Sequence, residues 1–364
     1  MDHRAAGLTD AEAIRMYRTM LLARRLDERQ WLLNRAGKLP FVISCQGHEA
    51  AQVGAGFALK PGVDFVLPYY RDLALVLALG VTSEAVMLAA FARADDPASG
   101  GRQMPNHFSD RRLRIFTQSS PTGTQIPHAV GFAWAARYTG EPFVAFVSFG
   151  DGTSNQGDFH EGLNFAGVFR LPVIAFVENN RYAISVPLER QIASPDVASR
   201  AQSYGMAGVK VDGRDPFAVY RVVREARERA LAGEGGTLIE ADVMRLTPHS
   251  SDDDDRTYRS REEVEALRQA DPVARVRAYL LEQALLDAAA LEALEAEVAA
   301  EVDRATAAAE AAPLPDPATA MRHVYAEAPE RPGASTDRWG GAGGKGPEGW
   351  TEPAPAGGGT DGGR

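Results

Sequence analysis

The sequence contains a single cysteine, Cys45, so it cannot form an internal disulfide and does not resemble a small secreted fold held by such bonds. A free cysteine is usually a small buried residue, with a catalytic thiol as the alternative. No apolar run approaches the roughly 20 residues of a membrane span. Residues 1–9 lack the charged-then-apolar pattern of a signal peptide. We therefore expect a cytoplasmic protein that does not enter a membrane.

Positive charge is also scarce. The 364 residues include 39 Lys and Arg against 49 Asp and Glu, which gives a formal net charge of −10, and no long basic cluster offsets it. A protein that neutralises many nucleic-acid phosphates needs a basic face, so nucleic acid is not an expected partner. A local pocket for one small phosphate group is compatible with this balance. Hydrophobic residues make up 45%, enough for a sizeable core.

Helical and strand-like patterns alternate along the chain. A capping-box pattern, Thr9 to Glu12, precedes the first helix. Helices are predicted at 13–35, 50–59, 73–93, 124–138, 155–169 and 216–232, and buried strands at 143–149, 172–177 and 237–246. This order predicts an α/β fold, with a doubly wound, mostly parallel sheet and helices on both faces. A helical C-terminal part, 262–312, should break near Asp271-Pro272.

The end of the chain has a different composition. Residues 331–364 contain Gly, Pro, Ala and polar residues but no Leu, Ile, Val or Phe. Such a segment cannot bury enough apolar surface to offset its ordering entropy. We therefore predict one domain over residues 1–330, followed by a disordered tail.

Two polar clusters follow the first two predicted strands. These are Gly150-Asp151-Gly152 and Glu178-Asn179-Asn180, with 26 residues, 153–178, between Gly152 and Asn179. That interval fits one helix and a returning strand, so both clusters should lie at the carboxyl edge of the sheet. Carboxylate and amide oxygens suit Mg²⁺, while glycines and a following helix N-terminus suit phosphate. Either cluster alone would be an ordinary turn; together they predict a magnesium–diphosphate site.

A wider set of motifs resembles the alpha subunits of branched-chain 2-oxo acid dehydrogenase complexes, in which Gly-Asp-Gly and Asn-Asn at this spacing mark thiamine diphosphate binding. The similarity runs from about Thr9 to about Tyr325. Its motifs are GRQMPNHFS (101–109), SSPTGTQIPHAVG (119–131), GDGTSNQGDFHEGLNFA (150–166), ENNRYAIS (178–185), VDGRDPFAVY (211–220) and HSSDDDDRTYRS (249–260).

The resemblance implies a role for individual residues. The expected magnesium ligands are Asp151, Asn180 and the backbone oxygen of Tyr182. The implied contacts of thiamine diphosphate are Tyr70, Arg71, Ser120, Thr122, Gly150, Asp151, Gly152, Thr153, Asn180, Tyr182, Arg245 and His249. Within this set, His249 and Ser120 are the expected catalytic residues. The implied substrate contacts are Phe41, Tyr70, His107 and Ser120.

Three further expectations concern loops around this site. Ser119, Pro121, Thr124 and Gln125 match a potassium-binding loop of some members, with an ordinary turn as the alternative. Glu178 stands where some animal relatives carry an arginine that meets the diphosphate; a carboxylate would repel it, so Glu178 is expected to pair with Arg181 or another cation. Most of Asp252 to Asp255 should be a solvated loop, without the spacing of an EF-hand calcium site.

The resemblance also implies the reaction. With a beta subunit, the chain would decarboxylate branched-chain 2-oxo acids on thiamine diphosphate and pass the acyl group to the lipoyl group of a dihydrolipoyl acyltransferase. A glutamate needed to activate the cofactor resides on the beta subunit in this family, so we expect an α2β2 assembly and an inactive isolated chain. The alternatives are a pyruvate or acetoin dehydrogenase alpha subunit, or a non-catalytic assembly protein, which the presence of Asp151, Asn180 and His249 disfavours.

Overall fold

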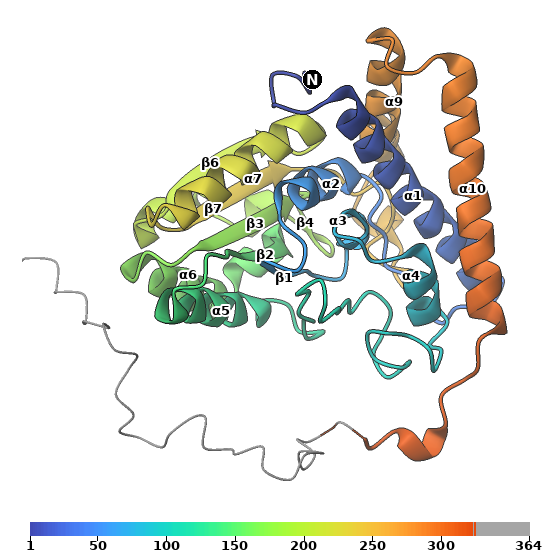
Figure 1. Cartoon of the computed structure of the whole chain (residues 1–364), viewed down its shortest axis with the longest axis horizontal. Coiled ribbons are helices and arrows are strands. Elements are labelled where there is room, and N and C mark those ends of the chain that lie inside the picture. The colour runs from blue at the N-terminus through green and yellow to red at the C-terminus, as the bar shows by residue number, and fades with distance from the viewer. Residues whose placement is uncertain (323, 325–364) are drawn as a thin grey trace, which may run out of the picture.

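The structure is a computed structural model that describes residues 1–322 and 324 (Figure 1). At its centre is a five-stranded parallel sheet with the order β1-β2-β3-β7-β6. The strands are β1 (Phe65–Leu67), β2 (Ala145–Gly150), β3 (Val173–Asn179), β6 (Ala207–Asp212) and β7 (Thr237–Asp242). A small antiparallel pair is formed by β4 (Tyr182–Ala183) and β5 (Val186–Pro187). The predicted tail, 331–364, and the predicted domain end at 330 lie outside the described residues.

Helices cover both faces of the sheet, as predicted. The helices α5 (Gln125–Thr139) and α6 (Gly157–Val168) lie on one face, and α2 (Glu49–Ala58) and α7 (Pro216–Leu231) lie on the other (Figure 1). Successive side chains of a strand point to opposite faces. Val147 of β2 therefore belongs to the core under α5 and α6, whereas its neighbour Phe146 belongs to the core under α2. Burial on both faces explains why these strands are continuous apolar runs.

An outer layer of helices packs on the α2 side. It consists of α1 (Asp10–Arg35), α3 (Leu73–Ala78), α4 (Ser83–Ala90), α9 (Pro272–Glu282) and α10 (Ala288–Ala311), where α10 runs along α1 (Figure 1). The helix α8 (Arg261–Gln269) precedes α9 and has no buried residue. The predicted capping box opens α1, because the Thr9 hydroxyl accepts from the Glu12 N–H at 3.2 Å and Glu12 accepts from the Thr9 N–H at 2.8 Å. Short 3₁₀ turns are η1 (Asp151–Asn155), η2 (Leu188–Arg190), η3 (Ala198–Tyr204), η4 (Asp255–Thr257) and η5 (Pro317–Thr319).

Several predicted boundaries differ from the structure. The helix expected over 73–93 is two helices, because Gly80 adopts φ +108° and Thr82 caps a new helix through the Ala85 N–H. The C-terminal part breaks at Asp271, as predicted, and again between α9 and α10. Two strands of the parallel sheet were missed, as were the two-residue strands β4 and β5. β1 has three residues, and β6 exposes alternate residues such as Lys210, so neither is a long apolar run. Among the described residues, no helix is both long and apolar enough to cross a membrane.

Candidate functional site

The two predicted polar clusters meet at the carboxyl edge of the sheet. Gly150 of β2 is in register with Glu178 of β3, so the residues that follow each strand are neighbours. A cavity of about 370 Å³ opens at this edge. Its wall consists of Tyr69, Tyr70, Arg71, Ser120, Thr122, Gly150, Asp151, Gly152, Thr153, Gln156, Asn180, Tyr182, Ala183, Ile184 and His249. The structure therefore brings together every predicted cofactor contact except Arg245, which lies behind the wall.

Asp151 and Asn180 present oxygen atoms to the cavity. Asp151 is 1% exposed; its Oδ2 accepts from Gln191 Nε2 at 2.8 Å, and its Oδ1 is buried without a hydrogen-bond partner among the described residues. Burial raises the pKa of the Asp151 carboxyl, because desolvation disfavours its charged form. A buried oxygen without a partner is costly unless a cation binds it. The site therefore fits a hard cation such as Mg²⁺.

The backbone around these residues is shaped for close approach. A Cβ atom at Gly152 would lie 2.7 Å from the Cβ of Ala183, so no side chain fits there. Arg181, between Asn180 and Tyr182, has φ +71°, a conformation that non-glycine residues rarely adopt and that is often found at functional sites. The expected helix N-terminus is replaced locally by the 3₁₀ turn η1, and α6 begins only after Gln156, which lines the cavity.

Arg71 and His249 form a hydrogen-bonded pair in the cavity wall. Arg71 is 2% exposed; its Nη1 donates to the Ser44 carbonyl at 2.8 Å, and its Nη2 donates to the His249 carbonyl at 3.0 Å and lies 2.9 Å from His249 Nδ1. Since a guanidinium only donates, His249 Nδ1 accepts and Nε2 carries the proton. Burial, with the charges of Arg71 and Arg245, lowers the pKa of His249 to about 3. His249 is therefore neutral near pH 7.

This shift predicts how folding stability depends on pH. The folded-state pKa of His249 is about 3, below its ordinary value of 6.5. Below pH 6.5 the unfolded chain binds a proton at this position that the folded chain does not, so stability is lost as the pH falls toward 3. The His249→Asn variant keeps an acceptor for Arg71 and lacks this proton.

We expect the unfolding free energy of the cofactor-free wild type to fall relative to that of His249→Asn between pH 6 and 4. The corresponding change in the unfolding equilibrium constant is at most about tenfold per pH unit. Urea unfolding at several pH values measures the difference. A difference that is independent of pH over this range would contradict the lowered pKa.

The loop after His249 is held by its own charged residues. The His249 N–H and the Tyr258 hydroxyl both donate to Asp253 Oδ2, at 2.7 and 2.5 Å. Arg259 donates to the Arg245 carbonyl at 2.6 Å and to Asp255 at 2.5 Å. The expectation of a mostly solvated aspartate run is therefore only half right. Asp252 and Asp254 are exposed, whereas the other two order the loop.

Arg245 supplies positive charge from behind the wall. It is 1% exposed, and its Nη2 donates to the Ile184 carbonyl at 2.9 Å and to the Tyr258 hydroxyl at 2.7 Å. Its Nε and Nη1 are buried without partners among the described residues. Burial, and then the charge of Arg71, lowers the pKa of Arg245 to about 10. Unpaired donors on a buried cation fit an anionic group bound nearby.

The predicted substrate residues are only partly assembled. Ser120 and Thr122 line the cavity, and His107 Nε2 lies 2.9 Å from the Ser120 hydroxyl, so His107 reaches the cavity through Ser120. Phe41 is not part of the wall. The backbone N–H of Val42 donates to the Ser251 hydroxyl at 3.1 Å, which places the Phe41 segment beside the His249 loop.

The predicted potassium loop forms a hydrogen-bonded turn. The Ser119 hydroxyl donates to the Pro121 carbonyl at 2.8 Å and lies 2.5 Å from the Thr124 hydroxyl. The side-chain amide oxygen of Gln125, Oε1, accepts from the Gly123 N–H at 3.0 Å instead. The groups of Ser119, Pro121 and Thr124 thus lie together. A potassium ion at this loop stays a prediction.

Within the part of the chain that the structure describes, Glu178 pairs with no cation, contrary to expectation. Arg181 donates to Asp242 at 3.1 Å, whereas Glu178 is fully buried and its Oε2 accepts from Gln52 Nε2 and from the Tyr69 hydroxyl, both at 3.0 Å. Burial, followed by the neighbouring Asp72 carboxyl, raises the pKa of Glu178 well above its usual range. This shift favours the neutral form of Glu178, a buried hydrogen-bonding residue under the cavity.

Substitutions at Glu178 test this neutral state. Glu178→Gln keeps the shape and the hydrogen bonds of a protonated carboxyl, so the unfolding free energy should change by less than about 1 kcal/mol. Glu178→Ala leaves a cavity and unpaired polar groups and should cost about 2–4 kcal/mol. Urea unfolding of both variants measures the effect. A large loss in Glu178→Gln would show that the buried group is charged.

Sequence patterns missed several residues that shape the site. His48, Gln52, Asp72 and Gln191 support the wall from positions far from the two motifs, and none belongs to a recognisable local pattern. Cys45 is 1% exposed and burial raises the pKa of its thiol well above normal. It does not line the cavity, which supports the prediction of a buried structural residue over a catalytic thiol.

The chain belongs to the dehydrogenase E1 component family, whose pattern matches residues 17–318. Membership of this family implies dependence on thiamine diphosphate. The chain is 58% identical over 325 residues to the 2-oxoisovalerate dehydrogenase subunit alpha of Bacillus subtilis, covering 89% of this chain and 98% of the relative. It is 43% identical over 270 residues to the 3-methyl-2-oxobutanoate dehydrogenase subunit alpha of Mycobacterium tuberculosis, covering 74% and 71%. It is 38% identical over 323 residues to the pyruvate dehydrogenase E1 component subunit alpha of Bacillus subtilis, covering 88% and 84%.

Proposed function

We propose that this chain is the alpha subunit of a branched-chain 2-oxo acid dehydrogenase. With a beta subunit it decarboxylates the oxo acid on thiamine diphosphate and passes the acyl group to the lipoyl group of a dihydrolipoyl acyltransferase. One observation carries the proposal: the unpaired Asp151 oxygen, the Asn180 amide and the Arg71–His249 pair meet in one cavity at the carboxyl edge of the sheet.

The residues present fit the diphosphate half of that cofactor with Mg²⁺. Asp151, Asn180 and the Tyr182 carbonyl would hold the metal, in keeping with its preference for a few protein oxygens together with phosphate and water. Arg71 and the unpaired donors of Arg245 would balance the diphosphate charge. Gly152 leaves room for the phosphate to approach the backbone. When bound, thiamine diphosphate supplies the nucleophilic carbon and the electron sink for decarboxylation.

The chain's own acid–base groups lie on the other side of the cavity. His249 is neutral, with its acceptor nitrogen fixed by Arg71, so its Nε2 proton is the one that can be donated to a reacting oxygen. Ser120 lies in the wall with His107 behind it, and this pair can orient the carboxylate or the oxo group of a substrate. We assign these residues to proton donation and to substrate positioning, respectively.

The substrate class rests on the comparison of two relatives from one organism. The identity is 58% to the 2-oxoisovalerate enzyme of Bacillus subtilis and 38% to its pyruvate enzyme, over nearly the same length of this chain. This difference favours a branched-chain substrate over pyruvate or acetoin. The retained Asp151, Asn180 and His249 favour an enzyme over a non-catalytic assembly protein. We further propose an α2β2 assembly located in the cytoplasm.

A substrate assay tests this function. The alpha chain co-expressed with its beta subunit should turn over 3-methyl-2-oxobutanoate at least tenfold more efficiently than pyruvate, measured as kcat/KM for decarboxylation with an artificial electron acceptor. The rigorously purified alpha chain alone should show no turnover. A clear pyruvate preference would overturn the substrate class, and turnover by the isolated chain would overturn the need for a beta subunit.

A further inference from the structure

His48 is a buried histidine beside the cavity that none of the motifs includes. It is fully buried, lies directly before α2, and its Nε2 is 3.1 Å from Nδ2 of Asn180. Its backbone N–H donates to the Cys45 carbonyl at 2.9 Å, and its carbonyl accepts from the Gln52 N–H at 3.1 Å. These bonds hold the backbone of His48 on both sides, while its ring Nδ1 is buried without a hydrogen-bond partner among the described residues.

The hydrogen bonds around Asn180 fix the orientation of its amide. The Tyr182 N–H donates to Asn180 Oδ1 at 3.2 Å, so the oxygen lies on the Tyr182 side and the amide nitrogen lies on the His48 side. An amide nitrogen only donates, so His48 Nε2 must accept and the ring proton must be on Nδ1. Two contacts from different parts of the chain thus agree on one orientation of the amide.

We propose that His48 is a positioning residue for Asn180. By accepting from Nδ2, it keeps the amide oxygen rather than the amide nitrogen available to a cation beside Asp151. Mg²⁺ takes oxygen ligands, and a reversed amide would present N–H donors to the metal. Partners that orient a metal ligand in this way contribute strongly to metal affinity. The inference rests on the proposed function, because it assigns a cation to this site.

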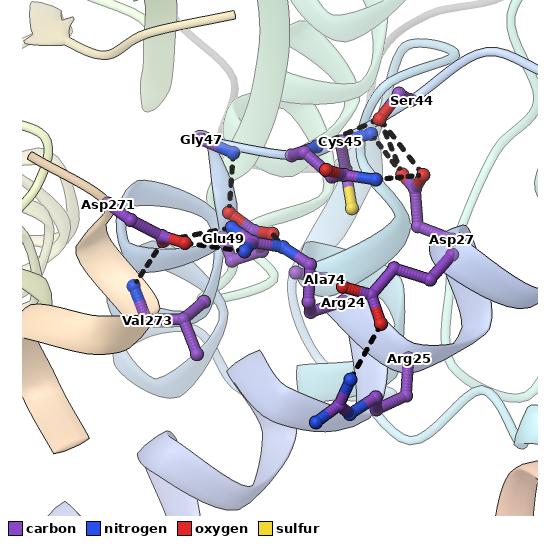
Figure 2. A network of polar contacts seen from close by, with 12 residues as sticks. Arg24, Arg25, Asp27, Ser44, Cys45, Gly47, Glu49, Ala74, Asp271 and Val273 are labelled. Atoms are coloured by element: carbon purple, nitrogen blue, oxygen red, sulfur yellow. Dashed lines mark hydrogen bonds and ion pairs between the residues drawn. The ribbon is translucent and has the colours of Figure 1, made fainter. Parts of the chain in front are cut away.

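The loop that carries His48 is anchored on both sides by buried charges. Asp27 of α1 accepts from the Cys45 N–H at 2.6 Å (Figure 2). Glu49 accepts from the Gly47 N–H and from Arg24 Nε, both at 2.7 Å (Figure 2). These two carboxyls are 1% and 0% exposed. Such a rigid support is what a positioning residue requires, since a mobile ring could not hold one orientation of an amide.

Two amide variants of His48 distinguish a role in orienting Asn180 from a role in filling space. In His48→Gln the terminal oxygen can reach the place of Nε2, whereas in His48→Asn the shorter side chain reaches only the place of Nδ1. Both variants are tested in the co-expressed α2β2 protein, by calorimetric titration of thiamine diphosphate at increasing Mg²⁺ concentrations. We expect His48→Asn to raise the half-saturating Mg²⁺ concentration about 10–100-fold. We expect His48→Gln to stay within about threefold of the wild type. At saturating Mg²⁺ both should bind thiamine diphosphate with wild-type affinity.

The outcomes are distinguishable from failure of the proposed function. If the wild type shows no magnesium-dependent binding, the proposed function fails before His48 is tested. If the wild type binds and both variants match it, or both are equally impaired with equal losses in Tm, His48 does not position the amide. If His48→Asn does not fold, His48→Leu provides the test, because it fills the space of the ring without an acceptor for the Asn180 amide nitrogen. It should also raise the half-saturating Mg²⁺ concentration about 10–100-fold, and a midpoint within threefold of the wild type would overturn the proposal.

Discussion

Replacement of Asp151 by alanine is expected to abolish magnesium-dependent binding of thiamine diphosphate. Its Oδ1 is buried without a hydrogen-bond partner among the described residues, at the point where two strands deliver their polar clusters. Loss of residues that only orient a metal ligand already weakens metal affinity 10–100-fold, so loss of the ligand itself should exceed about 100-fold. Titration of the co-expressed α2β2 protein, with and without Mg²⁺, measures the loss.

Two further variants sharpen this test. Asp95→Ala removes one exposed carboxylate outside the cavity wall and should bind like the wild type, which excludes an effect of net charge. Asp151→Asn keeps an acceptor for Gln191 and removes the carboxyl group. Burial raises the pKa of that carboxyl, because it disfavours the charged form. The variant should therefore bind the metal poorly and yet unfold at the same Tm as the metal-free wild type or at a higher one. A clear drop in metal-free Tm would mean that the protein itself stabilises the Asp151 carboxylate.

Gly47→Ala is expected to cause the largest loss of stability among the single substitutions considered. A Cβ atom there would lie 2.1 Å from the Met244 carbonyl oxygen, and Gly47 has φ +94°. The left-handed backbone costs about 1–3 kcal/mol, and the clash with backbone adds about 1–3 kcal/mol of overpacking. The loss should thus reach about 3 kcal/mol or more, measured by urea unfolding of the assembled protein.

Gly37→Ala is the matched control for this prediction. Gly37 also has a positive φ, +73°, but a Cβ atom there would meet nothing within 4 Å. The unfolding free energy of Gly37→Ala should fall only by the cost of the left-handed backbone, about 1–2 kcal/mol. Equal losses in both variants would show that the contact with Met244 is unimportant. Because Gly47 precedes His48, its substitution should also raise the Mg²⁺ requirement, which the Gly37 variant should leave unchanged.

The local patterns of the sequence predicted the parts of the fold that depend on them. The strands β2 and β3 are continuous apolar runs buried on both faces, and polar residues follow their ends, so the position of both clusters at one edge of the sheet could be predicted. The edge strand β6 could not be found this way, because exposure of alternate residues removes the apolar run. The break at Gly80 depends on a positive φ that the helical periodicity of the surrounding residues conceals.

The site shows the same division between local and long-range causes. Asp151, Asn180 and Arg71, which line one cavity, could be named as candidates, the first two from strand ends and the third from the resemblance. The neutral state of Glu178 could not be predicted, because it results from burial against Asp72, a residue more than a hundred positions away in the chain. The acceptor role of His48 likewise depends on Asn180, which is 132 positions away in the chain and meets His48 only in the folded protein. Charges that long-range packing buries do not leave a local pattern.

Arg24, which supports the loop before α2 through Glu49, has its second partner late in the chain. Its guanidinium donates to both carboxylate oxygens of Asp271, at 2.6 and 3.0 Å, and Asp271 also caps α9 (Figure 2). During synthesis, Arg24 and Glu49 are therefore made long before Asp271 leaves the ribosome. Until then the pair lacks one carboxylate and its burial is incomplete. The support of the loop before α2 is accordingly completed only once Asp271 has been made, although the sheet that carries the cavity ends at Asp242.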